Sequence, residues 1–246
     1  MPGTLKTVLI LGGTKEAAEM ARRLVDRGNL RVITALAGRT DSPRRPAGET
    51  RIGGFGGADG LSEFMRRESI DILVDATHPF AAQISANAVS AAEQTNTELL
   101  VFRRPQWTAV PGDIWHPVAS TREASVALPA DARVFLALGR QHLDAFLSRT
   151  DIHFILRMVD KPNAPPPFRS CDVIVGKPPP DTASEVDLLR THRTTHVVCR
   201  NSGGTGAYAK IEAARQLSLP VFMIGRPPEP VQKPFSTTDA LIAAIA

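Results

Sequence analysis

Two glycine-rich turns contain the residue types that could bind an anionic ligand. The first follows the apolar run from Val8 to Leu11, and small and apolar residues then recur at helical spacing as far as Gly28. A strand that ends in glycines and opens a helix is typical of a phosphate site, because backbone N–H groups approach the phosphate with no Cβ atom in between. A tight structural turn would explain two glycines equally well. The residues assigned to this first anion site are Gly12, Gly13, Thr14, Lys15 and Glu16.

Thr14 has two possible roles at this turn. Its side chain either caps the following helix or donates its hydroxyl to the ligand, since threonine is a common residue at both kinds of position. The residue types leave both roles open.

The second turn lies in the last third of the chain and repeats the pattern. An expected strand over 196–199 leads into a loop over 200–206, and Ala209, Ala213 and Leu217 then line one side of an expected helix. A helix N-terminus favours anions. The residues assigned to this second anion site are Arg200, Asn201, Ser202, Gly203, Gly204 and Lys210.

The loop after the second expected strand, 31–37, reads Gly38-Arg39-Thr40. In a dinucleotide-binding fold this position meets the adenosine ribose, where an acidic residue binds the 2′-hydroxyl of NAD and an arginine pairs with the 2′-phosphate of NADP. Arg39 therefore favours NADP, with a solvated basic loop as the alternative. Gly54 belongs to the next glycine-rich segment, over 51–57, whose glycine density indicates that backbone passes close to something flat or charged.

The fourth expected strand, 70–74, runs into Asp75-Ala76-Thr77-His78-Pro79-Phe80. This order places Thr77 and His78 at the carboxyl end of a strand, which is the rim where open parallel sheets bind ligands. We include Thr77, His78, Pro79 and Phe80 among the expected cofactor-binding residues. The alternative for His78 is a local capping role before Pro79.

Strands alternate with helices along the whole chain, which predicts an α/β protein with two doubly wound, parallel-sheet, Rossmann-like domains. The pattern breaks down in the arginine- and proline-containing segment over 103–112, so we expect a dinucleotide-binding domain over 1–112 and a second domain over 113–246. We also expect a helix over 141–147 and a stiff proline-rich loop over 161–168. The two glycine-rich corners could then face one another across a cleft.

Composition narrows the kind of partner. The chain has 246 residues, 43% hydrophobic residues and a net charge of +4, but its cations are scattered and lack the interleaved aromatic residues of a nucleic-acid groove. A small anionic molecule is the expected partner. The two cysteines, Cys171 and Cys199, match no metal-ligand spacing and indicate a reducing, cytoplasmic compartment, and no apolar run approaches membrane-spanning length. We expect no metal site, and the oligomeric state stays open.

The motifs LGGTKEA, RIGGFGG, DATHPFAAQIS, RRPQW, LGR, RNSGGTGAYAKI and PVFMIGRP occur in that order over nearly the whole chain. Together they resemble the precorrin-6A reductase family of cobalamin biosynthesis. The most specific parts are DATHPFA and the N-S-G-G loop followed by Lys210. One departure is Arg200, which stands where a lysine is expected and replaces a point charge with a planar fork.

The resemblance implies two Rossmann-like domains and leaves open whether they exchange a strand. It also implies an enzyme that uses NADPH to reduce one double bond of a tetrapyrrole. Such a macrocycle carries many carboxylates, so the enzyme needs several cations. The cations at loops or strand ends are Arg103, Arg104, Arg140, Arg157, Lys161, Arg200 and Lys210. The expected substrate-binding residues are Arg140 and the second anion site, which consists of Arg200, Asn201, Ser202, Gly203, Gly204 and Lys210. No residue stands out as the proton donor, and we assign no catalytic residue.

Two other interpretations of the sequence remain. One is a different Rossmann enzyme, such as an epimerase or a short-chain reductase, but the only tyrosine, Tyr208, is followed four residues later by Glu212 where such an enzyme would have lysine. The other is a non-catalytic dinucleotide-binding module, but this alternative gives the second glycine-rich corner no function. The sequence does not say whether cobalt is already present in the ring.

Overall fold

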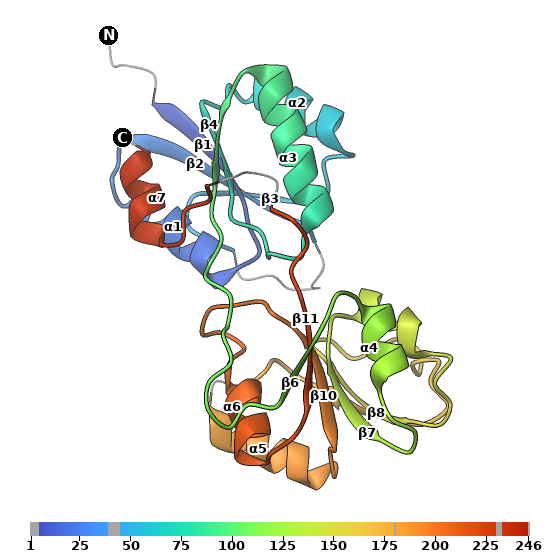
Figure 1. Cartoon of the computed structure of the whole chain (residues 1–246). Coiled ribbons are helices and arrows are strands. Elements are labelled where there is room, and N and C mark those ends of the chain that lie inside the picture. Colours follow the sequence, from blue (N-terminus) through green and yellow to red (C-terminus); the bar gives the residue numbers. More distant parts are fainter. Residues whose placement is uncertain (1–4, 39–44, 180, 230–232, 246) are drawn as a thin grey trace. The chain divides into compact units, whose positions relative to one another are not determined.

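The computed structural model describes residues 5–38, 45–179, 181–229 and 233–245. The chain divides into two compact units (Figure 1). Unit 1 consists of Met1–Pro105 together with Pro227–Ala246, and unit 2 consists of Gln106–Arg226. None of the helices in the described ranges combines the length and the apolar character that a bilayer crossing requires.

The sheet of unit 1 is parallel throughout and has the strand order β3-β2-β1-β4-β5. Its strands are β1 (Lys6–Leu11), β2 (Leu30–Leu36), β3 (Glu49–Ile52), β4 (Ile72–Asp75) and β5 (Glu98–Val101). Val8 pairs with Val32 of β2 on one side and with Ile72 of β4 on the other. Because β1 is central and fully buried residues alternate between its two faces, both faces need a covering layer of helices.

Helices cover the two faces of this sheet separately. On one face α1 (Lys15–Val25) and α7 (Thr238–Ala244) pack over β1, through a cluster that includes Met20, Leu24 and Leu241. On the other face α2 (Ala58–Arg67) and α3 (Ala82–Thr95) form a second cluster with Leu9 and Leu73. This is the doubly wound arrangement that the alternation of strands and helices predicts.

The sheet of unit 2 is also parallel and has the order β6-β11-β10-β7-β8-β9. Its strands are β6 (Trp115–Val118), β7 (Arg133–Ala137), β8 (His153–Met158), β9 (Cys171–Val175), β10 (His196–Arg200) and β11 (Val221–Ile224). The helices α5 (Thr182–Thr191) and α6 (Ala209–Gln216) pack on one face. The shorter α4 (Thr121–Ala127) lies on the other face (Figure 1). The 3₁₀ turns η1 (Arg140–His142) and η2 (Asp144–Phe146) lie on that face too, and Phe146 of η2 packs edge-on against Phe154 of β8.

The structure corrects several expected elements of unit 2. The expected helix over 141–147 is instead the pair η1 and η2, joined at Leu143, because Leu143 and Phe146 are spaced three residues apart and both turn into the core. The sequence analysis assigned no element to β6, β9 or α5. β6 contains Pro117, which lacks an N–H donor and is tolerated because β6 is an edge strand.

The division into units also differs from the expected boundary at residue 112. The chain leaves unit 1 after Pro105, and Pro227–Ala246 returns to unit 1 instead of completing unit 2. Phe235 forms a parallel bridge with Phe102, and the Arg103 N–H donates to the Phe235 carbonyl at 2.8 Å. The segment returns because Leu241 and Ile242 of α7 are buried in the core of unit 1 against α1.

We predict that Leu241→Ala lowers the stability of unit 1 by about 2–5 kcal/mol, because Leu241 is fully buried and its loss leaves a cavity between α7 and α1. Urea unfolding followed by circular dichroism measures the change. Val126→Ala on α4 is the control, since Val126 is 77% exposed and should cost less than about 0.5 kcal/mol. Equal effects of the two substitutions would show that α7 is not part of the core.

Candidate functional site

The carboxyl edge of the unit 1 sheet contains the point where the chain reverses its direction of strand addition. β1, β2 and β3 extend the sheet one way and β4 and β5 the other, so the crevice lies at the ends of β1 and β4. Ligands of open α/β sheets bind at such a point. The glycine turn at Gly12 and Gly13 and the segment beginning at Thr77 both lie there, as the sequence analysis expected.

The turn after β1 is held closely against the sheet. A Cβ atom at Gly12 would come within 2.9 Å of the Thr34 side chain, and Gly13 has a φ of +105° with open space where a Cβ would point. Thr14 caps α1, since its hydroxyl accepts from the Ala17 N–H at 3.1 Å and donates to the Ala76 carbonyl at 2.9 Å. The capping role expected for Thr14 is therefore confirmed, and its hydroxyl also links the ends of β1 and β4.

Lys15 and Glu16 differ in their surroundings. Lys15 is exposed at the first residue of α1. Glu16 forms an ion pair with Arg104 at 3.0 Å, with both side chains largely buried. Glu16 and Arg104 thus stabilise each other within unit 1.

A cavity of about 190 Å³ opens beside this turn. It is formed at the carboxyl ends of four strands and includes three of the expected cofactor residues, Gly12, Gly54 and Thr77. None of the described residues that line it is charged, and its walls are Leu11, Gly12, Ala35, Leu36, Ala37, Gly53, Gly54, Phe55, Gly56, Gly57, Leu61, Thr77, Ile84 and Asn87. A Cβ at Gly54 would meet nothing within 4 Å, so the glycine leaves room that a ligand can use. The cavity therefore offers uncharged, partly apolar space at the edge of the sheet where open α/β folds bind ligands.

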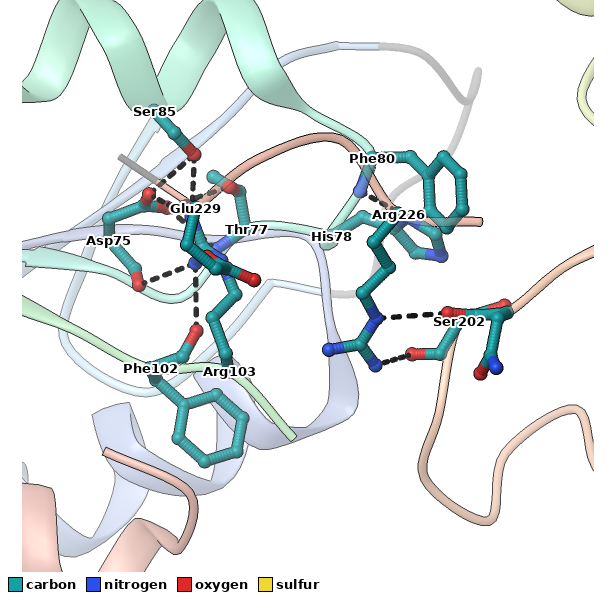
Figure 2. Close-up of polar contacts among 11 residues, drawn as sticks. Asp75, Thr77, His78, Phe80, Ser85, Phe102, Arg103, Ser202, Arg226 and Glu229 are labelled. Carbon is teal, nitrogen blue, oxygen red and sulfur yellow. Dashed lines mark hydrogen bonds and ion pairs between the residues drawn. The ribbon is translucent and has the colours of Figure 1, made fainter. Parts of the chain in front are cut away.

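A buried polar network lies under the Thr77 segment (Figure 2). The carboxylate of Asp75, at the end of β4, pairs with the Arg103 guanidinium at 2.7 Å. It also accepts hydrogen bonds from the Ser85 hydroxyl at 2.6 Å and from the Thr77 hydroxyl at 2.6 Å. Arg103 in turn donates to Glu229 at 3.0 Å. The network therefore fixes Thr77 at the rim and joins it to the C-terminal segment.

The pKa of Asp75 reflects competing effects. Burial alone raises the pKa of this carboxyl, but the Arg103 charge and the hydrogen bonds from Arg103, Ser85 and Thr77 together outweigh burial and lower the pKa below its usual value. Asp75 is fully buried, so its negative charge depends on Arg103. Arg103, which the sequence analysis counted among the cations available to substrate, is a structural residue of unit 1.

His78 and Phe80 lie on the loop between Thr77 and α3. The Phe80 N–H donates to His78 Nδ1 at 3.3 Å, and the two rings lie 5.8 Å apart (Figure 2). This local hydrogen bond is the kind of contact that the capping alternative for His78 predicts. It does not test a contact between His78 and a ligand.

The corresponding reversal point in unit 2 lies between β7 and β10. Arg200, at the end of β10, hydrogen-bonds to His142 Nε2 at 3.0 Å, which joins the segments after the two strands. The loop that follows is organised by Trp107: the Asn201 side chain accepts from the Trp107 N–H at 2.8 Å and donates to its carbonyl at 2.9 Å. The Trp107 indole also donates to the Gly204 carbonyl at 2.7 Å.

Lys210 belongs to the same internal arrangement. Its ammonium group donates to the Ala207 carbonyl at 2.6 Å and lies 5.1 Å from the Trp107 ring centroid. The side chain is buried, and burial lowers the pKa of its ammonium group. Asn201 and Lys210, both expected to bind substrate, are thus occupied in shaping the loop.

The other expected cations separate into two groups. Arg157 is buried in a two-bond pair with Glu185, at 2.6 Å for each bond, and is unavailable to a ligand in this conformation. Arg140 and Lys161 are exposed. Arg140 also lies at a cavity of about 280 Å³ between η1–η2 and the proline-rich loop. Gly38 has a φ of +70°, whereas Arg39 and Thr40 lie outside the described residues.

The sequence analysis missed two residues that shape these loops. Trp107 was treated as part of a domain junction, although an isolated tryptophan next to a proline-containing break is often an anchor. Arg51 was counted only as part of the glycine-rich segment over 51–57, although it lies two residues before the first glycine of that segment. Among the described residues, no group of three or more His, Cys, Asp or Glu side chains is placed to hold a metal ion.

Two doubly wound parallel sheets, with a glycine-lined crevice at the reversal point of the first, define a Rossmann-like protein of the dinucleotide-binding type. Residues 7–246 match the family model described as precorrin-6x reductase CbiJ/CobK. The chain belongs to this family.

Individual relatives agree with this assignment. The chain is 45% identical to the precorrin-6A reductase of Rhodobacter capsulatus over 97% of this chain and 95% of that protein. It is 31% identical to the cobalt-precorrin-6A reductase of Methanothermobacter thermautotrophicus over 90% of this chain and 76% of that protein. A solved structure described as CobK precorrin-6A reductase matches with a TM-score of 0.93 and 44% identity, over 98% of this chain and 96% of that chain.

We predict that Asp75→Asn destabilises the protein by about 3–5 kcal/mol at neutral pH, because it removes the fully buried partner of Arg103 and leaves this buried cation only the partly exposed Glu229. The lowered pKa sets the sign of the pH dependence. Ionised Asp75 stabilises the fold above its unfolded pKa of about 3.9, and this contribution is lost as the pH falls through the folded pKa. The difference in unfolding free energy between the wild type and Asp75→Asn should therefore shrink in acid.

Asp26→Asn is the matched control, since Asp26 pairs with Arg22 on the surface with both side chains 62% exposed. Its loss should cost no more than about 1 kcal/mol. A pH-independent gap between the wild type and Asp75→Asn would contradict the assigned ionisation of Asp75.

Proposed function

We propose that this chain is an NADPH-dependent precorrin-6A reductase, which reduces one double bond of the macrocycle to give precorrin-6B. The observation that carries the proposal is 45% identity to a precorrin-6A reductase over 97% of the chain. The glycine-lined crevice of unit 1 supports it, because such a crevice suits a dinucleotide. The reaction is an oxidoreduction of a CH–CH group.

In this proposal unit 1 holds NADPH, which supplies the hydride when bound. The turn of Gly12 and Gly13 at the start of α1 holds the pyrophosphate, and the apolar cavity beside it holds the adenosine end. Arg39 pairs with the 2′-phosphate. Thr77 lines the same cavity, and His78 follows Thr77 after β4, on the side of the crevice where the nicotinamide half of a dinucleotide runs.

Unit 2 is proposed to bind the carboxylates of the macrocycle. Arg140 is exposed beside a cavity, and Arg200 lies at the end of β10 next to the loop of Ser202, Gly203 and Gly204. Asn201 and Lys210 contribute by holding this loop in shape. Hydride transfer then requires the donor and acceptor carbons at reacting distance and shielded from water.

We further propose that the substrate is the metal-free ring. Relatives named precorrin-6A reductase are 39–46% identical to this chain, whereas those named cobalt-precorrin-6A reductase are 26–31% identical. The free thiols Cys171 and Cys199 suit a cytoplasmic location for this biosynthetic step.

The direct test incubates the purified protein with precorrin-6A and NADPH and follows NADPH oxidation together with the mass of the product. We expect NADPH consumption that depends on precorrin-6A and a product heavier by two hydrogen atoms. The cobalt-containing ring should react more slowly. NADPH binding without any turnover would favour a non-catalytic module, and faster turnover of the cobalt-containing ring would overturn the metal-free assignment.

We predict that Arg39→Ala weakens NADPH binding by about 10–100-fold, because a charge-assisted contact to the 2′-phosphate is worth about 1.5–3 kcal/mol. NADH lacks this phosphate, so its affinity should be unchanged. Calorimetric titration with each cofactor measures both constants. Equal loss of both cofactors would exclude the 2′-phosphate role.

A further inference from the structure

We propose that Arg51 is a positioning residue that shapes the adenosine end of the dinucleotide site. The inference rests on the proposed function, since it assigns the unit 1 cavity to one half of the cofactor. Arg51 is the third residue of β3, and the glycine-rich loop that begins two residues later forms one wall of this cavity.

Arg51 holds two consecutive carbonyl groups of this loop. One guanidinium nitrogen donates to the Gly53 carbonyl and another donates to the Gly54 carbonyl at 2.9 Å. The guanidinium carbon also lies 4.0 Å from the centroid of the Phe55 ring. Phe55 packs edge-on against Phe64 of α2, with ring centroids 5.2 Å apart, so Arg51 ties the loop to the core of unit 1.

These contacts set the direction of the loop amides. In a trans peptide the C=O and N–H groups point in opposite directions, so the N–H groups of Gly54 and Phe55 point away from Arg51. Gly53–Gly57 line the cavity and Arg51 does not, which places the amides on the cavity side. Within the part of the chain that the structure describes, these two amides donate no hydrogen bond.

A second contact keeps the next carbonyl out of the cavity. The Phe55 carbonyl oxygen lies against Gly60, at the position where a side chain would begin, so only glycine fits there. Three consecutive carbonyl groups, those of Gly53, Gly54 and Phe55, are therefore engaged by protein atoms. The face left for a ligand is made of N–H donors and apolar groups.

The combination of N–H donors with apolar walls suits a nucleoside. The described lining residues carry no charge, and Ala35, Leu61 and Ile84 provide apolar surface for a flat base. The ring nitrogens of adenine and the ribose oxygens are acceptors for the loop amides. The location agrees, because the ends of β2 and β3 lie beyond the pyrophosphate turn from β4.

Arginine is required here because its planar fork reaches two carbonyls while its face covers an aromatic ring. A glutamine keeps hydrogen-bonding groups but loses the charge and the stacked plane. Lysine keeps the charge, but its ammonium group is a point charge without the planar fork that reaches both carbonyls. We therefore expect affinity to fall in the order arginine, lysine, glutamine at this position.

The experiment titrates the full chain with adenosine 2′,5′-bisphosphate, a probe that lacks the nicotinamide half, and with NADPH. Arg51→Gln should weaken both by roughly tenfold, since two charge-assisted hydrogen bonds no longer hold the loop. In turnover with precorrin-6A the KM for NADPH should rise by a similar factor while kcat stays unchanged, because the reacting half of the cofactor is untouched.

Arg67→Gln is the matched control. The Arg67 guanidinium carbon lies 5.1 Å from the Phe64 ring in the same aromatic group, but Arg67 has no contact with the loop carbonyls. Arg67→Gln should leave both affinities at the wild-type level. Equal weakening by Arg67→Gln, or an Arg51→Gln protein that melts earlier but binds normally, would overturn the positioning role.

Gly54→Val tests the location of the probe, since it fills open space in the cavity at a residue whose backbone is not left-handed. We expect it to abolish binding of adenosine 2′,5′-bisphosphate, and undiminished binding would overturn the assignment of the cavity. If Arg51→Gln fails to fold, Arg51→Lys takes its place, with an expected intermediate affinity. Failure of the proposed function is distinct, because the wild type would then show no NADPH-dependent reduction.

Discussion

The buried ion pair between Asp75 and Arg103 is the interaction on which unit 1 depends. It joins the ends of β4 and β5, the first turns of α3 through Ser85, and the returning C-terminal segment through Glu229. A buried carboxylate is tolerated only when its charge and its hydrogen-bonding capacity are both satisfied, and Asp75 meets that condition with Arg103, Ser85 and Thr77. This network therefore holds in place the residues beneath the rim of the crevice.

The two glycine-rich loops are shaped by the same device. In unit 1, Arg51 donates to two successive carbonyls, those of Gly53 and Gly54. In unit 2, Arg226 at the end of β11 donates to the carbonyls of Asn201 and Ser202, both at 2.9 Å (Figure 2). An arginine fork fixes two peptide planes at once, which glycine-rich backbone cannot do alone. In both loops the arginine guanidinium group therefore holds the loop backbone in its conformation.

The sequence predicts local features of this fold well and long-range partnerships poorly. The corner from β1 to α1 is predictable because an apolar strand, a glycine pair and a helical repeat are adjacent in the chain. Arg103 was mistaken for an available cation because its partner Asp75 is 28 residues away, and nothing local marks the pair. Arg157 was misread for the same reason, since its partner Glu185 is also 28 residues away. α7 has a recognisable helical pattern, but the unit that it completes depends on tertiary packing.

The return of Pro227–Ala246 to unit 1 has a consequence for synthesis on the ribosome. Unit 2 is a continuous insertion between β5 and the C-terminal segment, and it can complete its sheet once β11 has emerged. The side of the first sheet that α1 and α7 cover together stays incomplete until α7 has left the exit tunnel. The unit whose strands are made first is therefore the last to close, and the nascent chain exposes apolar surface there throughout the translation of unit 2.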